Sequence, residues 1–201
     1  WKWEEFKNNT NSELIGKFGN FFNRTINLLN KNYPTLDVDK DSITLDDMDN
    51  QMIKDLEEIS NTIIDNYLHI KFRDAYKQLM LLATTANTYL EHKAPWTLIK
   101  NENHEEAKKV LYICLNICKT LAILGAPIMP EKMQDVWENQ LQFEGGVEQK
   151  GNIDNVGKIT VAKNHKIGAP KPLFRRIDDD YLNSLTEHFS NSLDIASLFA
   201  K

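Results

Sequence analysis

Apolar residues recur every three to four positions along most of this sequence of 201 residues. That spacing places them on one face of an α-helix, whereas the alternation typical of half-buried strands is brief here. It predicts helices over residues 11–31, 46–67, 70–90, 105–124 and 130–141, with a shorter one from 178 to about 189. We therefore expect an all-α fold, a helical bundle in which each helix buries one apolar face against its neighbours.

Residues that start and stop helices stand at the predicted boundaries. Residues 11–12 can cap the first helix, and Thr44 or Asp46 the second, because their side chains accept free backbone N–H groups. Pro130 is suited to the first position of the fifth helix. Residues 94–96, Ala-Pro-Trp, interrupt the third helix, since proline disfavours a helical residue before it.

The segment from 143 to 173 departs from the helical pattern. It is rich in Gly and Lys and alternates only at 159–161, so we expect a long loop or a weak hairpin. The length fits one domain over 1–201, with 143–176 as a loop or linker segment inside it and 190–201 as a flexible tail.

Composition narrows the possible classes of protein. No stretch has the roughly 20 apolar residues that span a bilayer, and residues 1–6 do not form a signal peptide, so we expect a cytoplasmic protein without a membrane partner. A start on Trp1 suggests a fragment of a longer chain. The net charge of −5 argues against a protein that coats DNA or RNA indiscriminately, although a local RNA contact remains compatible with it.

Charge is unevenly distributed. Residues 37–58 are acidic, while Lys and Arg gather between 158 and 176, where they could face phosphate. Cys114 and Cys118, four residues apart on an apolar helix face, are expected to be buried free thiols rather than metal ligands. We find no Gly-rich phosphate loop and no nucleophile paired with a base, so we assign no catalytic residue and no metal site.

A polar flank runs along the first predicted helix. At about 100° per residue, Lys17, Asn20, Arg24 and Lys31 lie beside the apolar stripe, and Asn20 and Arg24 stand one turn apart. An amide and a guanidinium so placed can hydrogen-bond base edges or phosphate. The alternative is an ordinary solvated flank.

Trp96 continues none of the apolar stripes and follows the helix-breaking Pro95. An exposed indole can stack on an unpaired base, which contributes about 1–3 kcal/mol. The same residue could instead pack against the end of the bundle as an apolar plug.

Several segments match one family in the right order. Residues 11–24 resemble the opening helix of the anticodon-binding domain of methionyl-tRNA synthetases. Further similar stretches are Phe72-Arg73-Asp74-Ala75, Ala86-Asn87-Thr88-Tyr89-Leu90, Lys93-Ala94-Pro95-Trp96, Leu98-Ile99-Lys100, residues 121–137 and Lys171-Pro172-Leu173-Phe174. The ordered set carries the resemblance, which omits the acidic loop, the Gly/Lys-rich insert and the tail.

The resemblance implies a function and a set of site residues. In that family the tryptophan matching Trp96 stacks on an anticodon base, and the residues matching Asn20 and Arg24 contact the anticodon. Lys17, Pro95 and Lys31 are supporting candidates. The partners implied are a methionine tRNA and a catalytic domain of the same chain. That domain would join methionine to tRNA with ATP, whereas this fragment would bind tRNA without a cofactor.

Two alternatives remain open. One is the anticodon-binding domain of another class I synthetase, for leucine, isoleucine, valine or cysteine, and the other is a helical protein-interaction adaptor that uses the acidic face.

Overall fold

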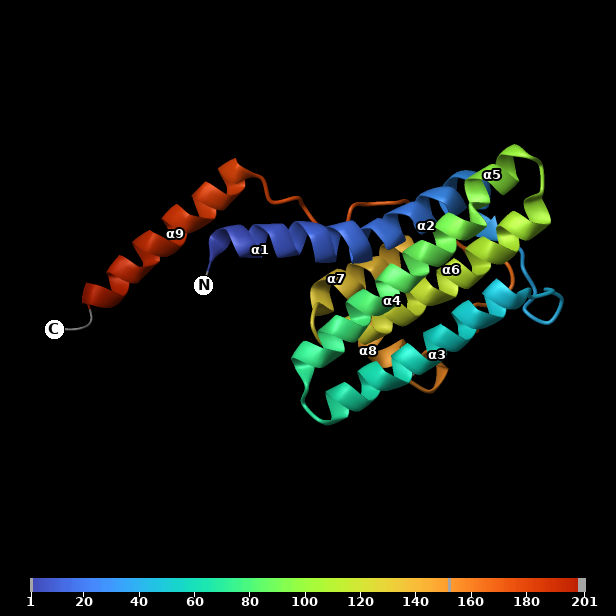
Figure 1. Cartoon of the computed structure of the whole chain (residues 1–201), viewed down its shortest axis with the longest axis horizontal. Coiled ribbons are helices and arrows are strands. Elements are labelled where there is room, and N and C mark those ends of the chain that lie inside the picture. The colour runs from blue at the N-terminus through green and yellow to red at the C-terminus, as the bar shows by residue number, and fades with distance from the viewer. Residues whose placement is uncertain (1, 152, 199–201) are drawn as a thin grey trace.

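The computed structural model describes residues 2–151 and 153–198, and most of them are helical (Figure 1). The helices are α1 (Trp3–Asn9), α2 (Asn20–Asn32), α3 (Asp47–Leu68), α4 (Phe72–Lys93), α5 (Pro95–Lys100), α6 (His104–Gly125), α7 (Pro130–Asp135), α8 (Val147–Lys150) and α9 (Asp179–Leu198). Two π-helical segments, Thr10–Gly19 and Val136–Gln140, and a 3₁₀ turn, Ile153–Asn155, complete them. The predicted all-α class is confirmed.

The first helix begins earlier than the sequence predicts. α1, the first π-helical segment and α2 form one unbroken helical stretch from Trp3 to Asn32. Asn11 does not cap a helix: its amide donates to the Ile177 carbonyl at 2.8 Å and its carbonyl accepts from the Ile177 N–H at 3.0 Å. Ser12 donates to the Asn8 carbonyl. The predicted start at 11–12 is therefore wrong, because the helix begins before these residues, and their side chains bond to Ile177 and to the preceding helical turn instead of capping a helix.

The start of α3 and the burial of α6 agree with the sequence. Asp46 caps α3 through a capping box, accepting from the Asp49 N–H while the Asp49 carboxylate accepts from the Asp46 N–H. α6 is buried along almost its whole length, as a central bundle helix requires. Cys114 and Cys118 are free thiols buried in it, and burial raises the pKa of both.

The Gly/Lys-rich segment is mostly loop, which agrees with the first of the two predicted alternatives; within its described residues the strand does not form a local hairpin. Strand β2 (His165–Lys166) pairs antiparallel with β1 (Thr35–Leu36), which lies far away in the sequence. Residues 160 and 161 donate their N–H groups to the Asn116 side chain of α6, at 2.7 and 2.9 Å. Local alternation could not reveal these partners, because both are non-local.

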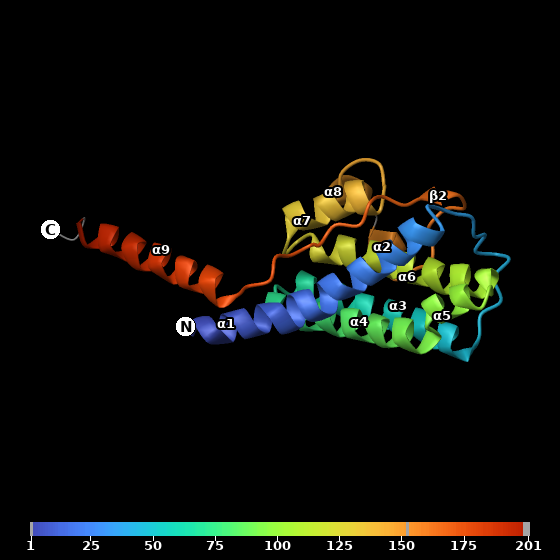
Figure 2. The same cartoon turned by 90° about the horizontal axis from the view of Figure 1, so that it is seen from above.

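The arrangement places α5 and α9 at opposite ends of the molecule (Figures 1 and 2). The long N-terminal helix and α4 lie side by side, while α9 extends away from the bundle beside α1. An ion pair of 2.6 Å between Lys7 and Asp179 joins α1 to α9. α9 continues through Leu198, so residues 190–198 extend the last helix, whereas 199–201 lie outside the described residues. Among the described helices, none combines the length and apolar character needed to cross a bilayer.

Candidate nucleic-acid interface

The polar flank of α2 faces α4 at the end of the bundle near α5. The Asn20 amide donates to the Asn87 side chain at 3.2 Å, and the Arg24 guanidinium binds the Glu91 carboxylate at 2.6 Å. Asn87 also donates to the Lys17 carbonyl at 2.9 Å, which fixes its orientation. Both helices thus present polar side chains four residues apart, so one turn of α2 matches one turn of α4.

Trp96 joins this group from α5. The Arg24 guanidinium carbon lies 4.9 Å from the centroid of the indole ring, within the range of a cation–π interaction. Asn20 is exposed, while Arg24 and Trp96 are partly exposed. We call Asn20, Arg24, Asn87, Glu91 and Trp96 the α2–α5 cluster. The structure therefore brings together the three residues that the sequence nominates for base contact.

A sharp turn between α4 and α5 sets the position of Trp96. Ala94 has a left-handed backbone with φ of 43°, a conformation that non-glycine residues rarely adopt. Pro95 follows as the first residue of α5 and is buried, so it orients the turn and offers little surface to a ligand. The left-handed residue thereby separates α5 from α4, and the indole at the start of α5 lies against Arg24.

A buried ion-pair network anchors the end of α4 immediately before that turn. The Asp49 side chain is fully buried, and its carboxylate lies 2.7 Å from the Lys93 ammonium and 2.8 Å from that of Lys109. The Tyr89 hydroxyl donates to it at 2.8 Å, and Lys93 also pairs with Asp46. Since Lys93 directly precedes Ala94, the network ties α3 and α6 to the turn that carries Trp96.

The same contacts control the charge of Asp49. Burial by itself would raise the pKa of this carboxyl, but hydrogen bonds from the two ammonium groups, the Asp46 N–H and the Tyr89 hydroxyl outweigh it and lower the pKa to about 2. Asp46, Asp49 and Glu106 lie close enough to hold a cation. Lys93 and Lys109 already provide the positive charge at this position, so we assign no metal there.

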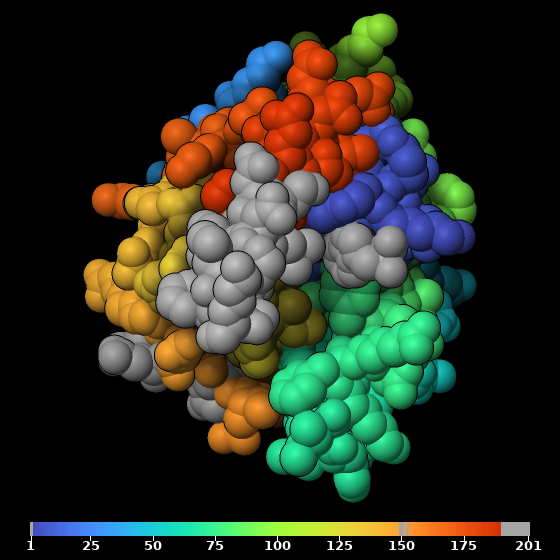
Figure 3. Space-filling model, turned by 90° about the vertical axis from the view of Figure 1, so that its left-hand side faces the viewer, coloured from blue at the N-terminus to red at the C-terminus, as the bar shows by residue number. Residues whose placement is uncertain are grey.

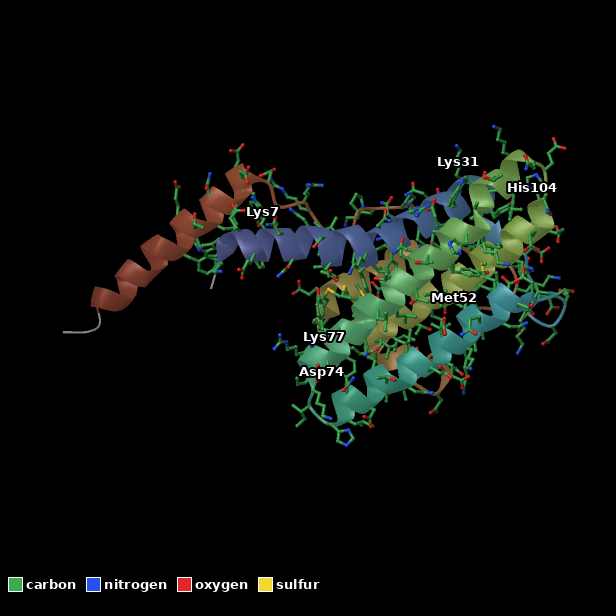
Figure 4. All side chains as sticks on the ribbon, in the orientation of Figure 1. Lys7, Lys31, Met52, Asp74, Lys77 and His104 are labelled. Carbon is green, nitrogen blue, oxygen red and sulfur yellow. The ribbon has the colours of Figure 1, made fainter. Side chains whose placement is uncertain are left out.

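The supporting candidates differ in position. The Lys17 ammonium pairs with Glu13 at 2.7 Å, so its side chain points along the helix away from the α2–α5 cluster. Lys31 is exposed at the end of α2, near α5 but outside the contacts of the cluster (Figure 4). In the basic segment, Lys163 pairs with Asp37 at 3.4 Å and Lys171 with Asp135 at 3.3 Å. Internal carboxylates thus partly neutralise that segment.

Sequence reasoning missed Asn87 and Glu91. Their four-residue spacing equals that of Asn20 and Arg24, and Asn87 lies in one of the stretches that carry the family resemblance. The matching spacing could have suggested that the two helices face each other, but only the fold reveals that they are neighbours.

The family model of the anticodon binding domain of methionyl tRNA ligase matches residues 41–194. This range includes Trp96, whereas Asn20 and Arg24 lie before it. The chain belongs to this family. The expected resemblance is confirmed, and the matched family is that of methionine rather than leucine, isoleucine, valine or cysteine.

Relatives within this methionyl-tRNA ligase family are longer than the chain. A methionine–tRNA ligase of Saccharolobus islandicus is 30% identical over 190 residues, which are 92% of this chain and 32% of that protein. One from Methanococcoides burtonii is 34% identical over 181 residues, 89% of this chain and 24% of that protein. The chain thus spans about a quarter to a third of the length of these curated relatives.

Solved structures share the fold. Apo methionyl-tRNA synthetase of Mycobacterium tuberculosis is similar with a TM-score of 0.76 and 18% identity, over 89% of this chain and 35% of that one. The same enzyme in complex with methionyl-adenylate gives a TM-score of 0.74 and 19% identity, over 86% and 33% of the two chains. At these identities the likeness concerns the fold alone.

Proposed function

We propose that this chain recognises the anticodon of a methionine tRNA, as the tRNA-selecting part of a methionine–tRNA ligase. The observation that carries the proposal is the convergence of an indole, a guanidinium and an amide, with 4.9 Å between Arg24 and the Trp96 ring, in a member of this family. Unpaired anticodon bases can stack on an aromatic ring and offer their edges to polar side chains. A small cluster of this kind needs no globally basic surface, in keeping with a net charge of −5.

Each member of the cluster has a role in this proposal. Trp96 stacks on a base, while Asn20 and Arg24 bind base edges or adjacent phosphate. Asn87 and Glu91 hold the polar pair in place before RNA arrives. Pro95 orients the turn that carries Trp96, and the backbone carbonyl of Lys17 accepts a hydrogen bond from Asn87.

The activity of the whole enzyme forms part of the same proposal. A catalytic domain elsewhere in the longer polypeptide would use ATP to join methionine to the tRNA, in the cytoplasm, where translation consumes the product. This chain would contribute tRNA selection and no reacting group. A protein-interaction adaptor has less support, because Asp46 and Asp49 of the acidic segment are used in internal ion pairs.

Exchange of the anticodon tests the proposal directly. We expect the chain to bind an anticodon stem-loop of methionine tRNA more tightly than the same stem with a permuted anticodon, by about 1–3 kcal/mol for each critical base. Fluorescence anisotropy titrations at fixed salt would measure both dissociation constants. Equal affinities, or no saturable binding of either RNA, would contradict anticodon recognition.

A second comparison separates specific contact from general attraction. Arg24→Ala is expected to weaken stem-loop binding by about 1–3 kcal/mol, because Arg24 lies against the indole. Lys31→Ala removes the same charge from the same helix but lies outside the cluster, so we expect a smaller loss and no change in preference between anticodons. Equal losses in the two titrations would reduce the role of Arg24 to phosphate attraction.

A further inference from the structure

A groove continues from the α2–α5 cluster along the line where the N-terminal helix meets α4. It has a volume of about 660 Å³, and its lining includes Glu13, Lys17, Arg73, Tyr76, Lys77 and Thr84. We call it the seam groove. The proposed function assigns this groove no ligand. Arg73 belongs to one of the stretches that carry the family resemblance.

The seam groove and the cluster share the same two helix faces. On α4, residues 73, 77, 80, 84, 87 and 91 follow one another at alternating spacings of four and three, which is one stripe along an α-helix. The facing stripe on the N-terminal helix contains residues 9, 13, 17, 20 and 24. The contacts of Asn20 with Asn87 and of Arg24 with Glu91 therefore join the two helices near α5. Toward the start of α4, the same two stripes line the seam groove.

The charge of the seam groove is positive although the chain is acidic. Among the residues that line it, Lys17, Arg73 and Lys77 carry positive charge and Glu13 carries negative charge. Glu13 is paired with Lys17, which leaves Arg73 and Lys77 in excess. Within the described part of the chain, the one ion-pair partner of Lys77 is the exposed Asp74 at 3.5 Å, and exposed pairs of this kind are weak. Arg73 is exposed and has no ion pair with any residue that the structure describes.

The two cations lie far from Trp96. Arg73 and Glu91 are 18 residues apart on α4, which is about 27 Å at a rise of 1.5 Å per residue. Figure 4 accordingly shows Lys77 at the end of α4 away from α5. The same end appears in Figure 3, where α1 lies above the α3–α4 turn. A separation of about 27 Å is more than the stacked bases of an anticodon can span, so an RNA held at the α2–α5 cluster could contact this end only through its stem.

We propose that the seam groove receives the phosphate backbone of the anticodon stem, with Arg73 and Lys77 as its principal contacts. This inference rests on the proposed function, because the stem can reach the groove only if the loop is held at the α2–α5 cluster. Phosphate contacts position an RNA without reading its sequence, whereas the cluster reads bases. The bundle would thus divide recognition between its two ends, with selection near α5 and alignment near the start of α4.

The double variant Arg73→Ala/Lys77→Ala tests this division in the 201-residue chain. We expect its affinity for the methionine anticodon stem-loop to fall roughly tenfold or more at 0.1 M salt, and the slope of log affinity against log salt to become shallower by about 1–2. Affinity for the isolated single-stranded anticodon loop, and the ratio between methionine and permuted anticodons, should stay at the wild-type values. Lys54→Ala is the matched control, since Lys54 is an exposed lysine on α3 outside the seam.

The outcomes distinguish this inference from the proposed function. A double variant that binds the stem-loop like wild type overturns the seam groove as a stem contact, and so does an equal loss for stem-loop and isolated loop. Trp96→Ala is measured beside it: if Trp96→Ala weakens binding while the double variant does not, only the seam inference fails. If Trp96→Ala has no effect, the proposed function itself fails.

Discussion

Replacing Asp49 with Asn is expected to lower the free energy of unfolding by about 3–5 kcal/mol. The carboxylate is fully buried and is the common partner of Lys93 and Lys109, so its neutralisation leaves two cations with less compensation inside the bundle. It also accepts from Tyr89 and closes the capping box of α3. Chemical denaturation followed by circular dichroism would measure the loss.

Asp47→Asn is the matched control for this prediction. Asp47 lies two residues away in the first turn of the same helix but is exposed, so its loss removes only a favourable interaction with the helix dipole, about 0.3–1 kcal/mol. Equal destabilisation by the two substitutions would contradict the assigned role of Asp49.

The pH dependence of stability provides a signature of the same network. Because the pKa of Asp49 is lowered from 3.8 to about 2 by folding, its ionised form stabilises the native state above about pH 4. That contribution is lost as the pH falls from about 4 to about 2. The wild-type chain should therefore lose more stability over this interval than Asp49→Asn, by about 2 kcal/mol.

Trp96→Ala is expected to weaken binding of the methionine anticodon stem-loop by about 1–3 kcal/mol, the usual contribution of an indole stacked on a base. The geometry behind this expectation is the Arg24 guanidinium over the indole and the strained turn at Ala94 that places it there. A plug at the end of the bundle would predict a different result, with loss of stability and unchanged affinity of the folded fraction.

A second substitution separates stacking from packing. Trp96→Phe keeps an aromatic face and should recover much of the affinity that Trp96→Ala loses. Both variants would first be checked by thermal unfolding, because Trp96 also packs partly against the core. Equal weakening by Phe and Ala in folded proteins would argue against base stacking.

Much of the bundle could be predicted from local patterns. The periodic burial of α6, the capping of α3 by Asp46 and the start of α7 at Pro130 follow from rules that act within one or two helical turns. These rules fail at residues 11–12, because the Asn11 side chain hydrogen-bonds to the backbone of Ile177 instead of capping its own helix. The pairing of Thr35 with Lys166 cannot be predicted from local sequence patterns either, since the two strands are two residues long and remote from each other in the sequence.

The candidate site shows the same limit. Helical spacing predicted that Asn20 and Arg24 share a flank, and the structure preserves this, although the preceding π-helical segment shifts the phase of the residues before Asn20. No local pattern relates that flank to Trp96, so only the family resemblance leads us to expect the two close together. The partners Asn87 and Glu91 and the buried anchor of Lys93 required tertiary structure, because each joins helices that are separated in the sequence.

Base stacking on Trp96 can be followed by fluorescence. A fluorescent base analogue would be placed at each anticodon position of the stem-loop in turn, and its emission measured with saturating wild-type chain, Trp96→Phe and Trp96→Ala. We predict that at one position the wild-type chain changes the emission strongly, that Trp96→Phe retains part of this change and that Trp96→Ala abolishes it. Identical emission changes with wild-type chain and Trp96→Ala at every position would rule out base stacking on Trp96.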